Sequence, residues 1–220
     1  MLKSGLLGLA FALAGNAVAG SQIYEPLATE VRADLQASIS DRPAPRHAFT
    51  NSAAAVNWLA EMSQRLETKI PDFRLRVEFL RTVHFESIRA GLDPQLVLAV
   101  IQIESGFRKY AVSRSGARGY MQLMPFWIRL VGRKGDNLFN LRTNLRYGCV
   151  ILKHYLNIEK GDLYRALGRY NGSVGRPEYP TLVIGAWRGV WRYQEKLAAA
   201  PRPGPVAQPY QAGKKLAIVA

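Results

Sequence analysis

One acidic residue closes an otherwise apolar helical pattern. Glu104 stands near the end of the run PQLVLAVIQIES, which covers residues 94–105. The residues one or two helical turns before it on the same face are Val97, Val100 and Ile101. Because desolvation disfavours a charged carboxylate, we expect the pKa of Glu104 to lie above the ordinary value of about 4.3. A glutamic acid that keeps its proton near neutral pH can act as a general acid; the alternative is a surface glutamate at a helix C-terminus.

Three polar clusters are expected to meet in one cleft. They are Glu104-Ser105, the run SRSGARGYMQLMP over 113–125, and the run RYNGS over 169–173. Each joins a helix end to a loop with glycine, which permits close backbone approach to an extended ligand. Serine, glutamine and asparagine offer the neutral donors and acceptors that bind hydroxyl and acetamido groups. Taken singly, Met121 and Met124 also fit core positions, and Tyr170 fits a half-buried packing aromatic.

The elements that must position these clusters are predicted to be helices. Apolar residues recur at helical spacing along most of the chain, and period-2 alternation is scarce, so the fold class is predicted to be mainly α. Asp93 is a suitable N-cap for the helix that carries Glu104, with proline at its first position. The expected helices cover about 27–39, 53–69, 73–90, 94–105, 121–130, 141–158, 162–170 and 180–197.

The N-terminus has the pattern of a secretory signal. Lys3 precedes an apolar stretch from Leu6 to Ala14, and Ala17-Val18-Ala19 fits a small-residue cleavage site. The stretch is short for a membrane span, and because no cysteine follows it, a lipoprotein is not expected. We predict a periplasmic or otherwise secreted protein cut near Ala19; an uncleaved N-terminal anchor is the alternative.

Four segments follow from these patterns. We predict a signal peptide over 1–19, an N-terminal helical extension over 20–72, a catalytic domain over 73–197 and a disordered tail over 198–220. The tail carries four prolines and few large apolar residues, so it cannot offset the entropy lost on ordering.

Charge and cysteine content narrow the function classes. The 220-residue chain has a formal net charge of +14, which favours an acidic partner such as nucleic acid, anionic lipid or a cell-wall polymer. The basic residues form no block and no known nucleic-acid-binding motif. A single cysteine, Cys149, excludes an intrachain disulfide. His47, His84 and His154 lack metal-ligand spacing, so no metal and no cofactor are expected.

Together the clusters resemble the soluble lytic transglycosylase (SLT) domain, a family similar to goose-type lysozyme. The resemblance covers about 75–195 and rests on LDPQLVLAVIQIESGF, AVSRSGARGYMQLMP, NLRYGC and ALGRYNGS, in that order. It implies a lysozyme-like helical domain in which Glu104 is the catalytic acid and base and Tyr170 lies near the reacting sugar. The implied glycan-binding residues are Ser105, Ser113, Met121, Gln122, Met124 and Asn171. Tyr120, Lys109-Tyr110 and the shortened YNG depart from the family pattern and leave subsite preference open.

The resemblance also implies a reaction. Glu104 would protonate the glycosidic oxygen between N-acetylmuramic acid and N-acetylglucosamine, then take the proton of the C6 hydroxyl as a 1,6-anhydro end forms. Ordinary glycosidases use two carboxylates, and no second one lies inside the clusters; Glu178, Asp136 and Asp162 are elsewhere.

Three other functions remain open at this point. One is a goose-lysozyme-type hydrolase, which would need a second carboxylate; one is a non-catalytic wall-binding protein; one is a basic nucleic-acid-binding module, for which secretion leaves few partners. We expect a monomer that acts on peptidoglycan strands, binds no nucleic acid and has cell-wall or secretion-machinery proteins as candidate partners.

Overall fold

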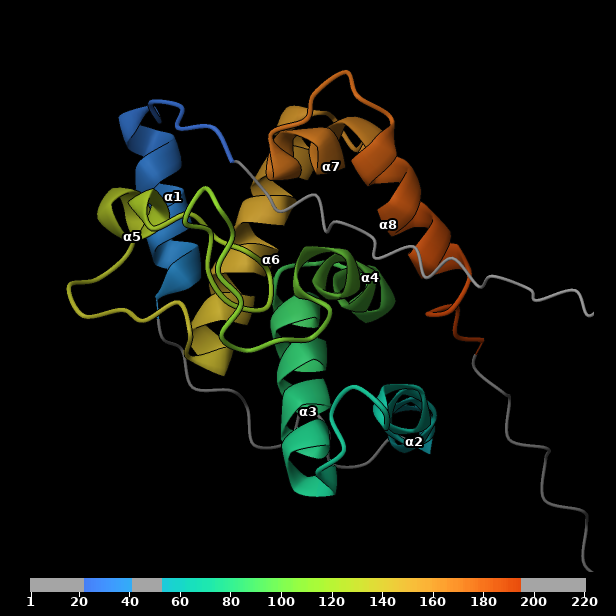
Figure 1. The fold of residues 1–220 in the computed structure, drawn as a ribbon. Coiled ribbons are helices and arrows are strands. Elements are labelled where there is room, and N and C mark those ends of the chain that lie inside the picture. The colour runs from blue at the N-terminus through green and yellow to red at the C-terminus, as the bar shows by residue number, and fades with distance from the viewer. Residues whose placement is uncertain (1–21, 41–52, 195–220) are drawn as a thin grey trace, which may run out of the picture.

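The computed structural model describes residues 22–40 and 53–194. These ranges consist of helices joined by loops (Figure 1). The helices are α1 (Thr29–Ile39), α2 (Ala53–Leu66), α3 (Phe73–Arg89), α4 (Pro94–Ser105), α5 (Phe126–Val131), α6 (Leu141–Ile158), α7 (Leu163–Asn171) and α8 (Glu178–Arg188). The only β pairing within the described ranges is two isolated bridges, Val112 with Arg118 and Arg118 with Leu123. The mainly α class predicted from the sequence is therefore confirmed for the described residues.

Helix α4 lies at the centre of the arrangement. It packs against α3 on one side and α8 on the other (Figure 1). Its residues from Leu96 to Ile101 are all buried, as expected of a helix with apolar residues on every face. The Asp93 carboxylate accepts a hydrogen bond from the Gln95 N–H at 2.8 Å and caps the helix. Gly106 ends it with a φ of 58°, so Glu104 falls in the last turn.

Helix α6 supports the remaining elements. It contacts α1, α3 and α7. A buried carboxylate, Glu86 of α3, faces three guanidinium groups: Arg89 at 2.9 Å, Arg142 at 3.5 Å and Arg146 at 3.4 Å. Two of these arginines belong to α6, so the buried charge is paired and joins α3 to α6.

The predicted N-terminal extension is helical and packs on the rest of the fold. Helix α1 contacts α5 and α6, and α2 contacts α3. Leu35 of α1 and Met62 and Leu66 of α2 are buried in the same hydrophobic cluster as the core of α4. The predicted extension therefore shares its core with the predicted catalytic domain.

The last helix is shorter than the sequence predicted. It ends at Arg188, because Gly189 turns the chain where a Cβ would lie only 2.8 Å from the carbonyl oxygen of Gly185. Within the described ranges no helix is both long and apolar enough to cross a membrane. The predicted signal peptide (1–19) and tail (198–220) lie outside the described residues.

Candidate active site

Glu104 is buried and held by a tyrosine from a distant part of the chain. Its exposed fraction is 2%. The hydroxyl of Tyr179, itself 1% exposed, donates a hydrogen bond to Glu104 Oε1 at 2.7 Å. Tyr179 lies in the first turn of α8, and the packing of α8 on α4 brings the two residues together. The carboxyl group is thus buried and oriented by this hydrogen bond.

Tyr170, predicted to lie near the reacting centre, is fully buried in α7. Its hydroxyl donates to the main-chain carbonyl oxygen of Met121 at 2.8 Å. Burial, and next the negative charge of Glu104, raise the pKa of Tyr170 and of Tyr179 well above 10. Both hydroxyls therefore keep their protons at neutral pH and act as hydrogen-bond donors.

This location sets the expected effect of Tyr170→Phe. The Met121 carbonyl would lose its donor, which should lower the free energy of unfolding by about 1–3 kcal/mol. The loop between α4 and α5, which contains Met121, would lose one of the hydrogen bonds that hold it. We therefore expect turnover to fall by up to about tenfold, equivalent to about 1.4 kcal/mol. Urea unfolding and the rate of wall lysis measure the two effects. Unchanged stability with a hundredfold loss of turnover would instead place the hydroxyl on the reacting sugar.

The loop between α4 and α5 is held by its own polar groups. Gln122 has a φ of 49°, and its Nε2 donates to the carbonyl oxygens of Gly119 at 2.9 Å and Ala111 at 3.2 Å. Ser113 Oγ accepts from the Ala117 N–H at 3.0 Å. These two predicted glycan-binding residues therefore fix the shape of the loop that would receive the ligand.

A buried asparagine of α6 braces the same loop. Asn144 is 0% exposed; its Oδ1 accepts from the Met121 N–H at 2.8 Å. Its Nδ2 donates to the carbonyl oxygens of Arg118 at 3.0 Å and Leu138 at 2.8 Å. Gly119 has a φ of 77°, and a Cβ there would collide with the Asn144 side chain. Asn144 is the first residue of the NLRYGC motif, so this motif supports the loop between α4 and α5.

Replacement of Asn144 tests whether its three side-chain hydrogen bonds stabilise the loop. In Asn144→Asp, a carboxylate would face two carbonyl oxygens and no longer donate to them, so we expect a loss of at least about 3 kcal/mol of stability. Asn140→Asp is the matched control, because Asn140 caps the same helix by accepting from the Thr143 N–H at 3.1 Å and aspartate caps equally well. Chemical denaturation measures both; similar values for the two variants would contradict the brace.

The other predicted site residues are mostly engaged within the fold. Ser105 Oγ donates to the carbonyl oxygen of Ile101 in its own helix at 3.2 Å. Met121 is fully buried and lies so close to Gly148 that a Cβ there would overlap its side chain. Asn171 is 2% exposed at the end of α7. Met124 is half-buried, and its main-chain N–H reaches residue 22, as described below.

Comparison with known proteins shows what part of the chain is similar to a known domain. Residues 82–178 match the model of the transglycosylase SLT domain. The matched range is 97 of the 220 residues, and over it this chain is similar to the SLT domain. The resemblance that the motifs predicted is therefore confirmed, and the matched range contains Glu104, Tyr170 and most of the loop-bracing residues.

The relatives of the SLT domain belong to longer proteins. The membrane-bound lytic murein transglycosylase C of Photorhabdus laumondii is 33% identical over 114 residues, which are 44% of this chain and 32% of the relative. The protein of the same name from Yersinia pestis is 32% identical over the same shares. This chain thus spans about a third of the length of these relatives. A solved structure of an inactive mutant of lytic transglycosylase Slt from Pseudomonas aeruginosa aligns with 77% of this chain and 35% of that one, at 20% identity and a TM-score of 0.41.

The three acidic residues named from the sequence as alternative second carboxylates have other surroundings. Glu178 is exposed at the start of α8, and the next residue, Tyr179, is the one that reaches Glu104. Asp136 accepts hydrogen bonds from the Tyr147 hydroxyl and the Arg133 N–H, and Asp162 caps α7. Among the described residues, no group of three or more histidine, cysteine or acidic side chains is arranged to hold a metal ion.

Sequence reasoning missed one residue that contacts Glu104 and two that contact the end of the loop between α4 and α5. These are Tyr179, Trp127 and Gln22, which lie outside the motifs used for the prediction. The sequence held a hint for one of them, because Tyr179 follows Glu178, which was named as a candidate second carboxylate. Gln22 and Trp127 carry no local signal.

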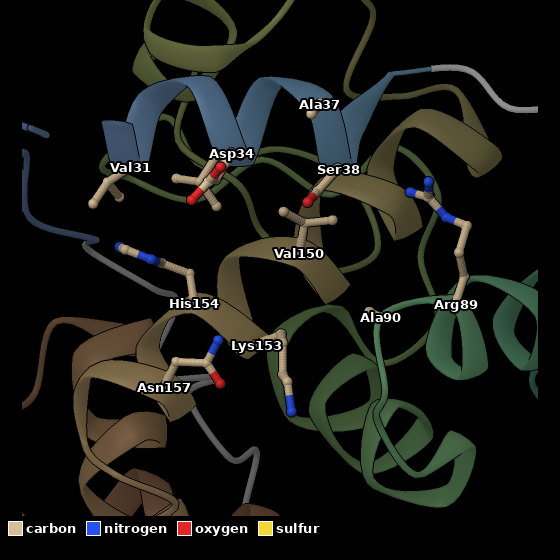
Figure 2. Close-up of a pocket in the computed structure, with 11 residues that line it drawn as sticks. Val31, Asp34, Ala37, Ser38, Arg89, Ala90, Val150, Lys153, His154 and Asn157 are labelled. Atoms are coloured by element: carbon tan, nitrogen blue, oxygen red, sulfur yellow. The ribbon is translucent and has the colours of Figure 1, made fainter. Parts of the chain in front are cut away.

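A separate concave region lies away from the SLT motifs (Figure 2). It has a volume of about 540 Å³ and lies between α1, α6 and the end of α3. Asp34, Arg89, Lys153 and His154 line it, and burial lowers the pKa of His154. None of the predicted site residues contributes to its lining.

Proposed function

We propose that this chain is a peptidoglycan lytic transglycosylase. It cleaves the β-1,4 bond between N-acetylmuramic acid and N-acetylglucosamine and leaves a 1,6-anhydro-muramyl end. The match to the SLT domain over 82–178 supports the reaction class, and relatives named as murein transglycosylases support the substrate. The observation that carries the proposal is Glu104, a buried carboxyl group oriented by the Tyr179 hydroxyl at 2.7 Å.

The chemistry runs through one carboxyl group. Glu104 first donates its proton to the glycosidic oxygen, and the bond to the anomeric carbon breaks. The Tyr179 hydroxyl then stabilises the Glu104 carboxylate by a charge-assisted hydrogen bond. The carboxylate removes the proton of the C6 hydroxyl of the same sugar, whose oxygen closes on the anomeric carbon. The proton returns to Glu104, so the cycle is balanced and consumes no water.

The surroundings of Glu104 favour this route over hydrolysis. An inverting hydrolase places a second carboxylate about 6.5–9.5 Å from the acid to activate water, and a retaining one places it at about 5–5.5 Å. Of the alternatives named from the sequence, Glu178 is exposed, while Asp136 and Asp162 hold local structure. Glu104 itself is 2% exposed, which limits access of water to the reacting centre.

The other residues predicted from the sequence have places in this proposal. Ser113, Gln122, Met124 and Asn171 shape and line the glycan site, with Ser105 and Met121 behind them in the fold. The net charge of +14 suits the acidic cell-wall polymer. The secretory signal predicted over 1–19 would direct the enzyme out of the cytoplasm. We also propose that it works as a monomer.

Analysis of digestion products tests the proposal. Purified peptidoglycan is digested in oxygen-18-labelled water, and the muropeptides are analysed by mass spectrometry with and without borohydride reduction. A lytic transglycosylase leaves ends that contain no label and resist reduction, whereas a hydrolase leaves labelled, reducible ends. Labelled ends would replace the proposal with a goose-lysozyme-type hydrolase, and no digestion would favour a wall-binding protein.

A further inference from the structure

The chain just before α1 contacts the end of the loop between α4 and α5 and the start of α5. Gln22 is 4% exposed. Its side-chain Oε1 accepts hydrogen bonds from the main-chain N–H of Met124 at 3.2 Å and from the indole N–H of Trp127 at 2.9 Å. The first of these donors belongs to the loop that carries most of the predicted glycan-binding residues. Gln22, about a hundred positions earlier in the sequence, therefore occupies a main-chain hydrogen-bond donor of the candidate site.

The other end of the Gln22 carboxamide faces the catalytic neighbourhood. It lies close enough to the Tyr170 hydroxyl to oppose the rise in the Tyr170 pKa, to which the Glu104 charge contributes. Its Nε2 is nevertheless buried without a hydrogen bond of regular geometry to any described residue. Gln22 thus lies buried among Met124, Trp127 and Tyr170, and its firm hydrogen bonds are those that its Oε1 accepts.

Residues 23–26 lie at the surface, and Leu27 after them packs partly buried against the core. Tyr24 contacts the edge of Phe126 with ring centroids 5.6 Å apart, and Glu25 pairs with Arg169 at 3.4 Å. Ile23 and Tyr24 are 58% and 56% exposed. Exposed ion pairs and half-exposed aromatic contacts contribute little to stability. The segment can therefore leave the site at a modest cost, while α1 remains packed through Leu35 and Ile39.

We propose that residues 22–26 are a built-in, displaceable occupant of the glycan-binding site, and that the Gln22 carboxamide takes the place of a sugar acetamido group. Both groups present an amide carbonyl that can accept from the Met124 N–H. Glycan that binds to this N–H would therefore compete with Gln22 for it. This inference rests on the proposed function and adds self-inhibition to it.

The consequence is a lowered apparent affinity for glycan. When only a fraction of molecules has an open site, the apparent dissociation constant rises by the inverse of that fraction. Loss of the two hydrogen bonds to Gln22 Oε1 should open the site, and we expect glycan to bind about tenfold more tightly to Gln22→Ala. Glu25→Gln, which weakens the surface ion pair, should act in the same direction by about two- to threefold.

The test measures binding of the soluble trimer of N-acetylglucosamine to the wild-type protein and the two variants. Titration calorimetry gives the affinities, and the indole N–H resonance of Trp127 reports whether Gln22 has left. Gln36→Ala is the matched control, because Gln36 is exposed on α1. Binding to the wild type should move the Trp127 resonance towards its position in free Gln22→Ala, and the control should match the wild type.

Each other outcome decides against the inference. Equal affinity in all four proteins would show that the segment does not compete with glycan, and would leave the proposed function intact. Weaker binding to a folded Gln22→Ala would make Gln22 a part of the glycan site. Absence of binding in all four would overturn the proposed function together with this inference.

Discussion

Glu104→Gln should abolish wall lysis and leave the fold intact. Glutamine is nearly isosteric and still offers Oε1 to the Tyr179 hydroxyl, but its amide cannot donate a proton as an acid or accept one as a base. Loss of general acid–base catalysis typically costs about 10²- to 10⁴-fold. Because one carboxyl group performs both steps here, we expect a loss at or above the upper end. The measurement is the release of muropeptides from purified peptidoglycan, followed over several days.

The control for this variant is its structure and its ligand binding. The melting temperature should stay within a few degrees of the wild type, since glutamine is neutral, as the protonated acid is, and keeps the hydrogen bond from Tyr179. Affinity for the trimer of N-acetylglucosamine should be retained. Activity within tenfold of the wild type would remove Glu104 from the mechanism and, with it, the proposed lytic transglycosylase.

Tyr179→Phe is expected to produce the second largest loss of activity. The hydroxyl donates to Glu104 Oε1 at 2.7 Å and remains protonated at neutral pH, because burial and the nearby charge raise its pKa. Hydrogen bonds to charged groups contribute about 1.5–3 kcal/mol. Its loss should lower the turnover number by roughly ten- to a hundredfold, since the carboxylate is no longer oriented or stabilised between the two proton transfers. A shift of the pH–rate profile should accompany the loss.

Tyr147→Phe is the matched control for that experiment. Tyr147 is also buried, and its hydroxyl also donates to a carboxylate, that of Asp136, outside the candidate site. This variant should lose stability while its turnover and pH profile stay close to the wild type. Equal loss of turnover in both variants would mean that Tyr179 acts through stability alone.

Several local features followed from short stretches of sequence. The pattern over 94–105 predicted a helix, Asp93 its cap and Glu104 its last turn, and the structure has them at those places. Helix period, caps and glycine turns depend on neighbours within about four residues, so one sequence carries the information. The boundary of α8 was predicted less well, because the turn at Gly189 depends on close approach to Gly185.

The side-chain contacts of the candidate site depend on packing between segments that are distant in the sequence. Tyr179 lies 75 residues after Glu104 and reaches it only because α8 packs across α4. Gln22 lies 102 residues before Met124, and no spacing rule connects the two. Tyr170 was predicted to lie near the reacting sugar, with a half-buried packing position as the alternative, and its hydrogen bond to the Met121 carbonyl was not foreseen.

The sequence by itself thus determined the helical class, the position of the acidic residue and the SLT motifs, because these reside in local periodicity and in short contiguous runs. The tertiary structure alone decided which hydroxyl orients Glu104, which polar groups brace the loop and what lies against the site. Such contacts join side chains that are far apart in the chain. They exist only when helices α4, α6, α7 and α8 have packed and their buried polar groups have found partners.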